Sequence, residues 1–201
     1  RDWFTVKFIQ MAALALVFTS SQVFAQDYEA GLAAAEAGDY EAALEEFRPL
    51  AEQGDRYAQS NLGYAYAAGQ GVLQDYAETV KWYRLAAEQG DEQAQAKLGY
   101  AYTTGQGVLQ DYAEAVKWFR LAAEQGDAQA QYNLGALYNN GEGVPQDYAT
   151  AHMWFNLAGS NGDADGGERR DTIAANMTPA AIEEAQRRAR ECMGSDYQNC
   201  D

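Results

Sequence analysis

The sequence predicts an all-α protein, a right-handed α-solenoid of antiparallel helix pairs. Two observations lead to this fold class. Three of the four tryptophans, Trp82, Trp118 and Trp154, are spaced by 36 residues, and residues 55–90 and 91–126 differ at only eight of their 36 positions. A helix pair of this length cannot bury its apolar face alone, so neighbouring pairs must stack.

Each repeat is predicted to contain two helices, and an aspartate marks each start. Its carboxylate can accept hydrogen bonds from the first-turn amides. The aspartates in this position are Asp39, Asp55, Asp75, Asp91, Asp111, Asp127, Asp147 and Asp163. Glu78 and Glu114 follow three residues after two of them, which predicts a reciprocal capping box. Gly63, beside the apolar stripe of the first helix, is expected to allow a close backbone approach.

The predicted organisation has six parts. A signal peptide covers 1–25, a tetratricopeptide-like helix pair covers 26–54, repeats cover 55–90, 91–126 and 127–162, and a capping helix with a tail covers 163–201. Within the last part, Thr178 and Pro179 predict the start of a helix that runs through residue 193.

Residues 1–25 have the pattern of a secretory signal peptide. A short apolar run from Phe8 to Phe18 precedes small residues, Val23 and Ala25, which predicts cleavage before Gln26. The run is about half of the roughly 20 residues needed to cross a bilayer, so no membrane span is expected after cleavage. Since Gln26 is not a cysteine, no lipid attachment is expected. The predicted location is the periplasm or the exterior of the cell.

The sequence of one repeat resembles the motif of a known family. Residues 94–126 contain A-Q-x-x-L-G-x-x-Y-x-x-G-x-G-V-x-Q-D-Y-x-x-A-x-x-W-x-x-x-A-A-E-Q-G, which resembles the Sel-1-like repeat, a longer-looped relative of the tetratricopeptide repeat. The resemblance covers about 39–162. It implies a non-catalytic adaptor or scaffold that binds a partner protein or peptide. Cysteine-rich members that bind or hydrolyse β-lactams supply a second hypothesis, and an envelope or exopolysaccharide assembly scaffold is a third.

Composition and motifs argue against other functions. The formal net charge of −16 leaves no basic surface for nucleic acid and favours a partner with basic residues. His152, the one histidine, replaces Val80 and Val116 of the other repeats, so a packing role is favoured over a metal site or a catalytic triad. No catalytic residue, cofactor or metal site is predicted, and the chain is expected to be a monomer.

Cys192 and Cys200 are the two cysteines of the chain. In an oxidising compartment they are expected to form a disulfide that ties the tail to the last helix, with two separate thiols as the alternative. No repeat contains a cysteine, in contrast to the cysteine-rich β-lactam-binding members. This difference weakens the β-lactam hypothesis.

Positions that change between near-identical repeats are the candidates for partner binding. Helical spacing places them towards the groove side of the first helices, although plain solvent exposure is an equally good explanation. These residues are Tyr57, Asn61, Tyr64, Gln93, Lys97, Tyr100, Gln129 and Asn133.

Overall fold

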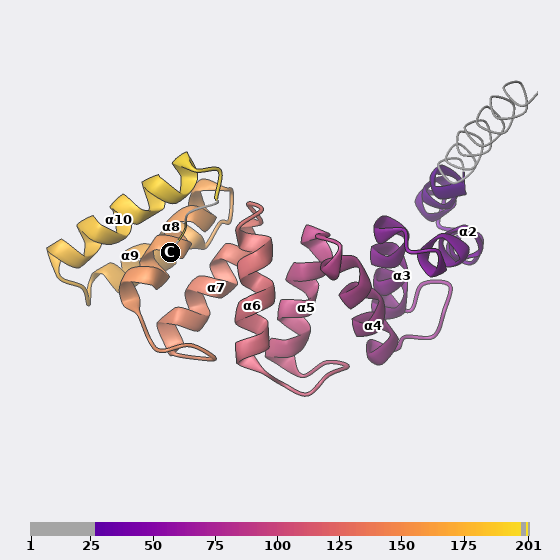
Figure 1. Ribbon diagram of the computed structural model, residues 1–201, viewed down its shortest axis with the longest axis horizontal. Helices are drawn as coiled ribbons and strands as arrows, with labels where there is room; N and C mark the ends of the chain where they lie inside the picture. The colour runs from indigo at the N-terminus through magenta and orange to yellow at the C-terminus, as the bar shows by residue number, and fades with distance from the viewer. Residues whose placement is uncertain (1–26, 198–199, 201) are drawn as a thin grey trace, which may run out of the picture.

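The computed structural model describes residues 27–197 and residue 200, so the predicted signal peptide lies outside the described residues. Residues 27–36 are helical. The helices that follow are α2 (Tyr40–Glu52), α3 (Arg56–Ala68), α4 (Tyr76–Glu88), α5 (Glu92–Thr104), α6 (Tyr112–Ala123), α7 (Ala128–Asn140), α8 (Tyr148–Ser160), α9 (Gly166–Ala174) and α10 (Pro179–Gly194). From α2 to α9 each helix packs on the next, in one row (Figure 1), which confirms the predicted α-solenoid.

Aspartates cap the helices at almost every expected start. Asp55 Oδ1 accepts the amide of Ala58 at 2.8 Å, and the carboxylates that accept first-turn amides in α2 to α8 are those of Asp39, Asp55, Asp75, Asp91, Asp111, Asp127 and Asp147. The exception is α9, where Asp165 holds the cap position without a side-chain bond. Asp163 nevertheless accepts the amide of Gly166 at 2.9 Å.

The predicted capping box is wrong in one of its two hydrogen bonds, the one from the Asp75 amide to the Glu78 carboxylate. The Asp75 amide donates instead to the carbonyl of Tyr66 at 3.0 Å, where the loop returns to the preceding helix. Glu78 instead accepts from Lys81 at 2.8 Å and from the Trp82 indole at 3.1 Å. The next repeat behaves in the same way, since the amide of Asp111 donates to Tyr102.

In each of the three repeats, a glycine of the first helix faces an aromatic ring of the second helix. A Cβ atom at Gly99 would lie 2.6 Å from Cδ1 of Phe119, and Gly63 and Gly135 face Tyr83 and Phe155 in the same way. The close approach expected at Gly63 is therefore to a ring of the second helix and not to its backbone. This contact lets the two helices of a pair bury their shared face.

Buried glutamines connect successive pairs. Gln95 on α5 donates from Nε2 to the carbonyl of Ala87 at 3.1 Å, and its Oε1 accepts from Gln125 at 2.8 Å. Gln59 and Gln131 make the equivalent pairs of bonds one repeat earlier and one repeat later. Each glutamine therefore joins the ends of two successive second helices through the first helix between them.

The C-terminal end closes the array with two helices. The predicted capping helix is present as α10, with Thr178 accepting the amide of Ala181 at 3.2 Å. The helix α9 that precedes it corresponds to the helix start predicted at Asp163, and it begins three residues later, at Gly166. Both pack on α8 (Figure 1), and Arg188 Nη1 ties α10 to α8 by donating to Thr150 Oγ1 at 3.2 Å.

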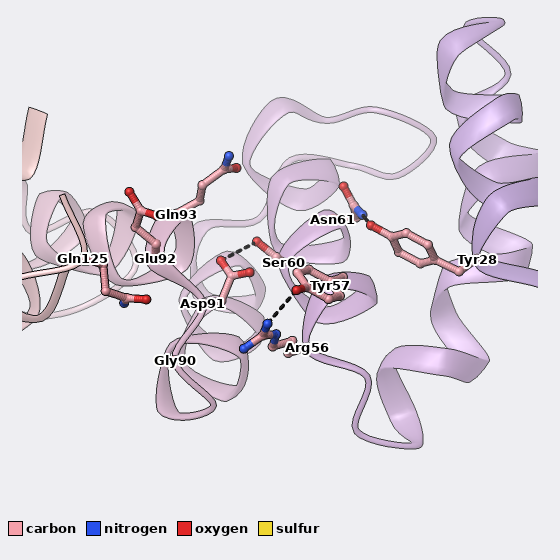
Figure 2. Close-up of a pocket in the computed structure, with 10 residues that line it drawn as sticks. All are labelled: Tyr28, Arg56, Tyr57, Ser60, Asn61, Gly90, Asp91, Glu92, Gln93 and Gln125. Atoms are coloured by element: carbon pink, nitrogen blue, oxygen red, sulfur yellow. Dashed lines mark hydrogen bonds between the residues drawn. The ribbon is translucent and has the colours of Figure 1, made fainter. Parts of the chain in front are cut away.

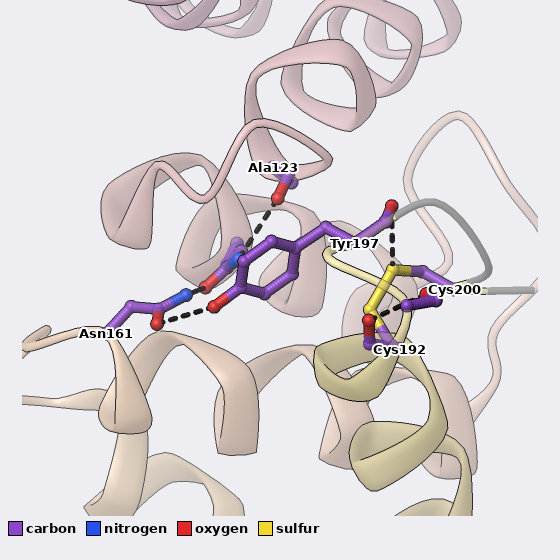
Figure 3. Close-up of a disulfide and its surroundings, with 7 residues drawn as sticks. Ala123, Asn161, Cys192, Tyr197 and Cys200 are labelled. Carbon is purple, nitrogen blue, oxygen red and sulfur yellow. Dashed lines mark hydrogen bonds between the residues drawn. A yellow bond between two sulfur atoms is a disulfide. The ribbon is translucent and has the colours of Figure 1, made fainter.

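The tail is held at two points (Figure 3). A disulfide joins Cys192 of α10 to Cys200, and the Tyr197 hydroxyl donates to Asn161 Oδ1 at 2.7 Å. Asn161 in turn donates to the buried Gln131. The hydrogen bonds that connect the repeats therefore extend to the tail.

His152 on α8 is 2% exposed, and its Nδ1 has no hydrogen-bond partner among the described residues. Burial lowers the pKa of this imidazole below its usual value, and the positive charge of Arg170 lowers it further, while Asp171 acts in the opposite direction. The neutral form therefore fits the packing role that the sequence predicts for His152.

Replacing the buried Gln95 with alanine should lower the free energy of unfolding by about 1–3 kcal/mol, because two hydrogen bonds of its side chain would be lost. One goes to the Ala87 carbonyl, which would keep the Gly90 amide, and the other comes from the Gln125 side chain. Gln93, two residues earlier on the same helix, is exposed, so Gln93→Ala should change stability by less than about 0.5 kcal/mol. Urea unfolding of both variants measures the difference. Equal effects would contradict the connecting role of Gln95.

Gly99→Ala should destabilise the protein by about 1–3 kcal/mol, because the added methyl group would overlap the Phe119 ring. Gly167 on α9 is the matched control, since a Cβ there meets nothing within 4 Å. Gly167→Ala should be neutral or stabilising by up to about 1 kcal/mol through helix propensity. Thermal melting of both variants tests the contact, and an equally stable Gly99→Ala variant would refute it.

Stability should fall between neutral and mildly acidic pH through His152. The unfolded imidazole binds a proton near pH 6.5, whereas the folded one binds it only at lower pH, so stability is full above about pH 6.5 and decreases as pH falls towards the folded pKa. His152→Val, which copies Val80 and Val116, removes this titration. Urea midpoints at pH 7.5 and 5.0 should drop more for the unaltered chain than for the variant, and equal drops would exclude the effect.

Candidate partner-binding face

All eight residues predicted to bind a partner lie on α3, α5 and α7, the first helices of the three repeats. They line hollows that follow one another along the array. Tyr57, Asn61 and Gln93 line a hollow of about 410 Å³. Gln93 also borders a hollow of about 490 Å³ that contains Lys97, Tyr100, Gln129 and Asn133, and Tyr64 joins Lys97 and Tyr100 around a third, of about 270 Å³.

The 410 Å³ hollow is ordered by hydrogen bonds between neighbouring helices (Figure 2). Asn61 donates to the Tyr28 hydroxyl at 3.1 Å, which ties α3 to the helix at residues 27–36. Ser60 donates to Asp91 at 3.2 Å, and this bond joins α3 to the start of α5. The Arg56 guanidinium donates to the Tyr57 hydroxyl at 2.5 Å. The bonds of Asn61 and Ser60 therefore hold the walls through contacts between neighbouring helix pairs, whereas the bond from Arg56 to Tyr57 lies within α3.

The floor of this hollow is acidic. Asp91 and Glu92 line it side by side, while Arg56 is its one cation. Burial raises the pKa of the Glu92 carboxyl above its usual value, and the charges of Asp127 and Asp91 raise it further. An arriving cation would relieve this repulsion between carboxylates, so the hollow suits a basic side chain.

Exposed tyrosines and amide side chains line the other two hollows, together with Lys97 and, in the larger one, Asp127. Tyr64 and Tyr100 are each 53% exposed. Asn133 and Gln129 contribute amide groups from α7. Tyrosine faces with neighbouring amides provide apolar contact and hydrogen bonding together, which is typical of surfaces that bind peptides and proteins.

Sequence reasoning missed several residues of this face. Tyr28 lies outside the repeat, so no comparison between repeats could select it. Asp91, Asp127 and Ser60 line the hollows as well, but the two aspartates had already been assigned as helix caps. Ser60 differs from Ala96 and Tyr132 at the same register, and this variation was the available signal.

Among the described residues, no group of three or more His, Cys, Asp or Glu side chains could hold a metal ion. The helices of residues 27–197 are also too short or too polar to span a membrane.

Stacked helix pairs with a row of hollows along the first helices define this protein as an α-solenoid of short helical repeats. The model of the Sel1 repeat matches residues 56–91, 92–127 and 128–163, which is more than half of the sequence. The chain belongs to the Sel1 repeat family.

Two solved structures resemble this one closely. The first is a protective antigen present in uropathogenic Escherichia coli strains displaying an SLR fold, with 34% identity and a TM-score of 0.75 over 91% of this chain. The match spans 41% of that antigen's chain. The second is a Sel1 repeat protein from Oxalobacter formigenes, with 29% identity and a TM-score of 0.71 over 87% of this chain and 79% of that one. No protein of curated function matches the sequence.

Proposed function

We propose that this chain is a non-catalytic adaptor or scaffold, periplasmic or secreted, that binds a partner protein or peptide along the face formed by α3, α5 and α7. One observation carries the proposal: the residues that differ between near-identical repeats line one continuous series of hollows. Repeats that share one backbone and vary at these positions present different side chains at a fixed spacing, which suits recognition of an extended partner.

The charge of the hollows supports a partner with basic residues at one position. Asp91 and Glu92 share the 410 Å³ hollow, so a lysine or arginine of the partner would fit there. The association should weaken as salt is raised, because the hollow is open to solvent and its charges are screened. Tyr64, Lys97 and Tyr100 would then contact the neighbouring part of the partner.

The disulfide supports an extracytoplasmic location. Cys192 and Cys200 are joined, and such bonds persist in oxidising compartments. This agrees with the signal-peptide pattern of residues 1–25.

Site-specific crosslinking in the native envelope tests the proposal. A photo-reactive residue at position 100 should capture a discrete partner. The same residue at position 121, an exposed leucine on the second helix α6, should not. Recovery of the same species from both positions, or of none from position 100, would contradict binding along this face.

A matched pair of alanine variants extends the test. A first triple variant, with Tyr64→Ala, Lys97→Ala and Tyr100→Ala, should lower partner recovery at least about tenfold, a loss of about 1.4 kcal/mol of binding free energy. The control triple variant carries Lys81→Ala, Leu85→Ala and Leu121→Ala. It removes one cation and two large exposed side chains from the second helices and should preserve recovery. Stable membership of a large assembly would indicate the envelope-scaffold form of the function, and transient recovery would indicate the adaptor form.

A further inference from the structure

A separate hollow lies at the C-terminal end of the array, between α7, the start of α8 and α9. Its volume is about 310 Å³, at the lower end of the range for small-molecule sites. Most of its accessible lining is polar, with Arg169, Asn176 and Tyr148 among the contributors, and Phe155, Ile173 and Ala136 form a smaller apolar wall. None of the eight residues predicted from the sequence belongs to it.

Arg169 is the one ionisable cation of this hollow, and no carboxylate lines it. This is unusual in a chain with 30 acidic and 14 basic residues. The adjacent Arg170 is paired with Asp171 at 2.7 Å, whereas no ion pair among the described residues involves Arg169. Glu168 and Asp165 act on Arg169 only as nearby charges.

The guanidinium of Arg169 is held in place on one side only. Its Nε donates to the Tyr132 hydroxyl at 3.1 Å, and the Tyr132 ring packs on Phe155 with 5.3 Å between ring centroids. The two Nη groups make no hydrogen bond within the described part of the chain. They form the planar fork that matches the two oxygens of a carboxylate.

The repeat register gives independent support. Arg169 lies 72 residues, or two repeats, after Lys97, and Tyr148, Phe155 and Ile173 correspond in the same way to Tyr76, Tyr83 and Ala101. These four earlier residues line the 270 Å³ hollow, which also contains a single cation and no acid. The array therefore builds the same type of hollow twice, although α9 has lost most of the repeat sequence.

We propose that the Arg169 hollow binds a carboxylate that carries a neighbouring apolar group. The fork of Arg169 would hold the carboxylate, and the apolar group would lie on Phe155 and Ile173. A single exposed arginine binds a carboxylate weakly, so the apolar wall must contribute to the affinity. A phosphate dianion fits less well, because one arginine cannot balance two charges beside an apolar wall in a protein of net charge −16.

Such a group occurs at the C-terminus of a peptide that ends in an apolar residue and in free N-acylated amino acids. Both ligands present a carboxylate next to an apolar side chain, and the peptide and amino-acid probes below distinguish them. The site does not depend on partner binding along α3, α5 and α7, so failure of either proposal leaves the other standing.

Titration of the protein with N-acetyl-leucine, followed by the backbone and arginine Nε–H signals in NMR, tests this site. The expected result is saturable shifts in α7 and α9 with a dissociation constant on the order of millimolar. N-acetyl-leucinamide, which lacks the charge, should bind at least about fivefold more weakly, a difference of about 1 kcal/mol. Equal binding of the acid and the amide would overturn the proposal, and so would tighter binding of inorganic phosphate.

Two variants locate the site. Arg169→Gln should remove the preference for the acid over the amide, while Lys81→Gln, which removes an exposed cation of α4 that is paired with Glu78, should preserve it. An unchanged preference in Arg169→Gln would overturn the assignment. Because the acid and amide are compared on the unaltered chain, the proposal remains testable even if Arg169→Gln fails to fold.

A tetrapeptide Ac-Ala-Ala-Ala-Leu, as free acid and as C-terminal amide, distinguishes the two sources. Tighter binding of the free-acid peptide than of N-acetyl-leucine supports a peptide C-terminus as the ligand. Weaker binding supports a free acyl amino acid. Shifts by neither peptide nor N-acetyl-leucine at α9 would refute the site.

Discussion

The buried glutamine of each repeat is the contact on which the array depends. The last carbonyls of a helix have no partner within that helix. Those of Ala51, Ala87 and Ala123, at the ends of α2, α4 and α6, each accept an amide from the turn that follows, of Gly54, Gly90 and Gly126. Gln59, Gln95 and Gln131 donate to these carbonyls and accept from the end of the next second helix. The three glutamine side chains are buried, and a buried polar group without a partner costs about 1–3 kcal/mol. A shift of one helix pair against its neighbour would break the hydrogen bond from the glutamine to the carbonyl of the preceding pair and leave the buried amide group of that glutamine without a partner. This requirement sets the register in which the pairs stack.

The stacking register in turn places the variable residues. Because the pairs repeat every 36 residues, one position of the first helix recurs along the array as Asn61, Lys97, Asn133 and Arg169. The hollows between them change in charge along the array. The N-terminal hollow has Asp91 and Glu92, whereas the C-terminal one has Arg169 without an acid. The two ends of the face therefore differ in charge. An extended ligand with unlike charges at its own ends would bind in one preferred direction.

Much of the fold and part of the candidate face followed from local pattern. The seven aspartates that cap α2 to α8 act within three residues of themselves, and the 36-residue period identifies the helices they begin. The predictions that were wrong or incomplete involve more distant groups. The Glu78 capping box is replaced because the Tyr66 carbonyl, brought back by the loop, reaches the amide of Asp75 first. The connecting glutamines were visible as identical polar residues in all three repeats, but their partners lie 8 and 30 residues away.

The sequence alone determined the class of fold, the helix starts and the eight variable residues that line the hollows, because hydrogen bonds within one turn and the repeat period are properties of neighbouring residues. The tertiary structure decided which residues from different helices share a hollow. Tyr28 meets Asn61 across 33 positions, and Arg169 meets Tyr132 across 37. Such contacts depend on how one helix pair rotates against the next, and that rotation is set by buried side chains packed between the pairs.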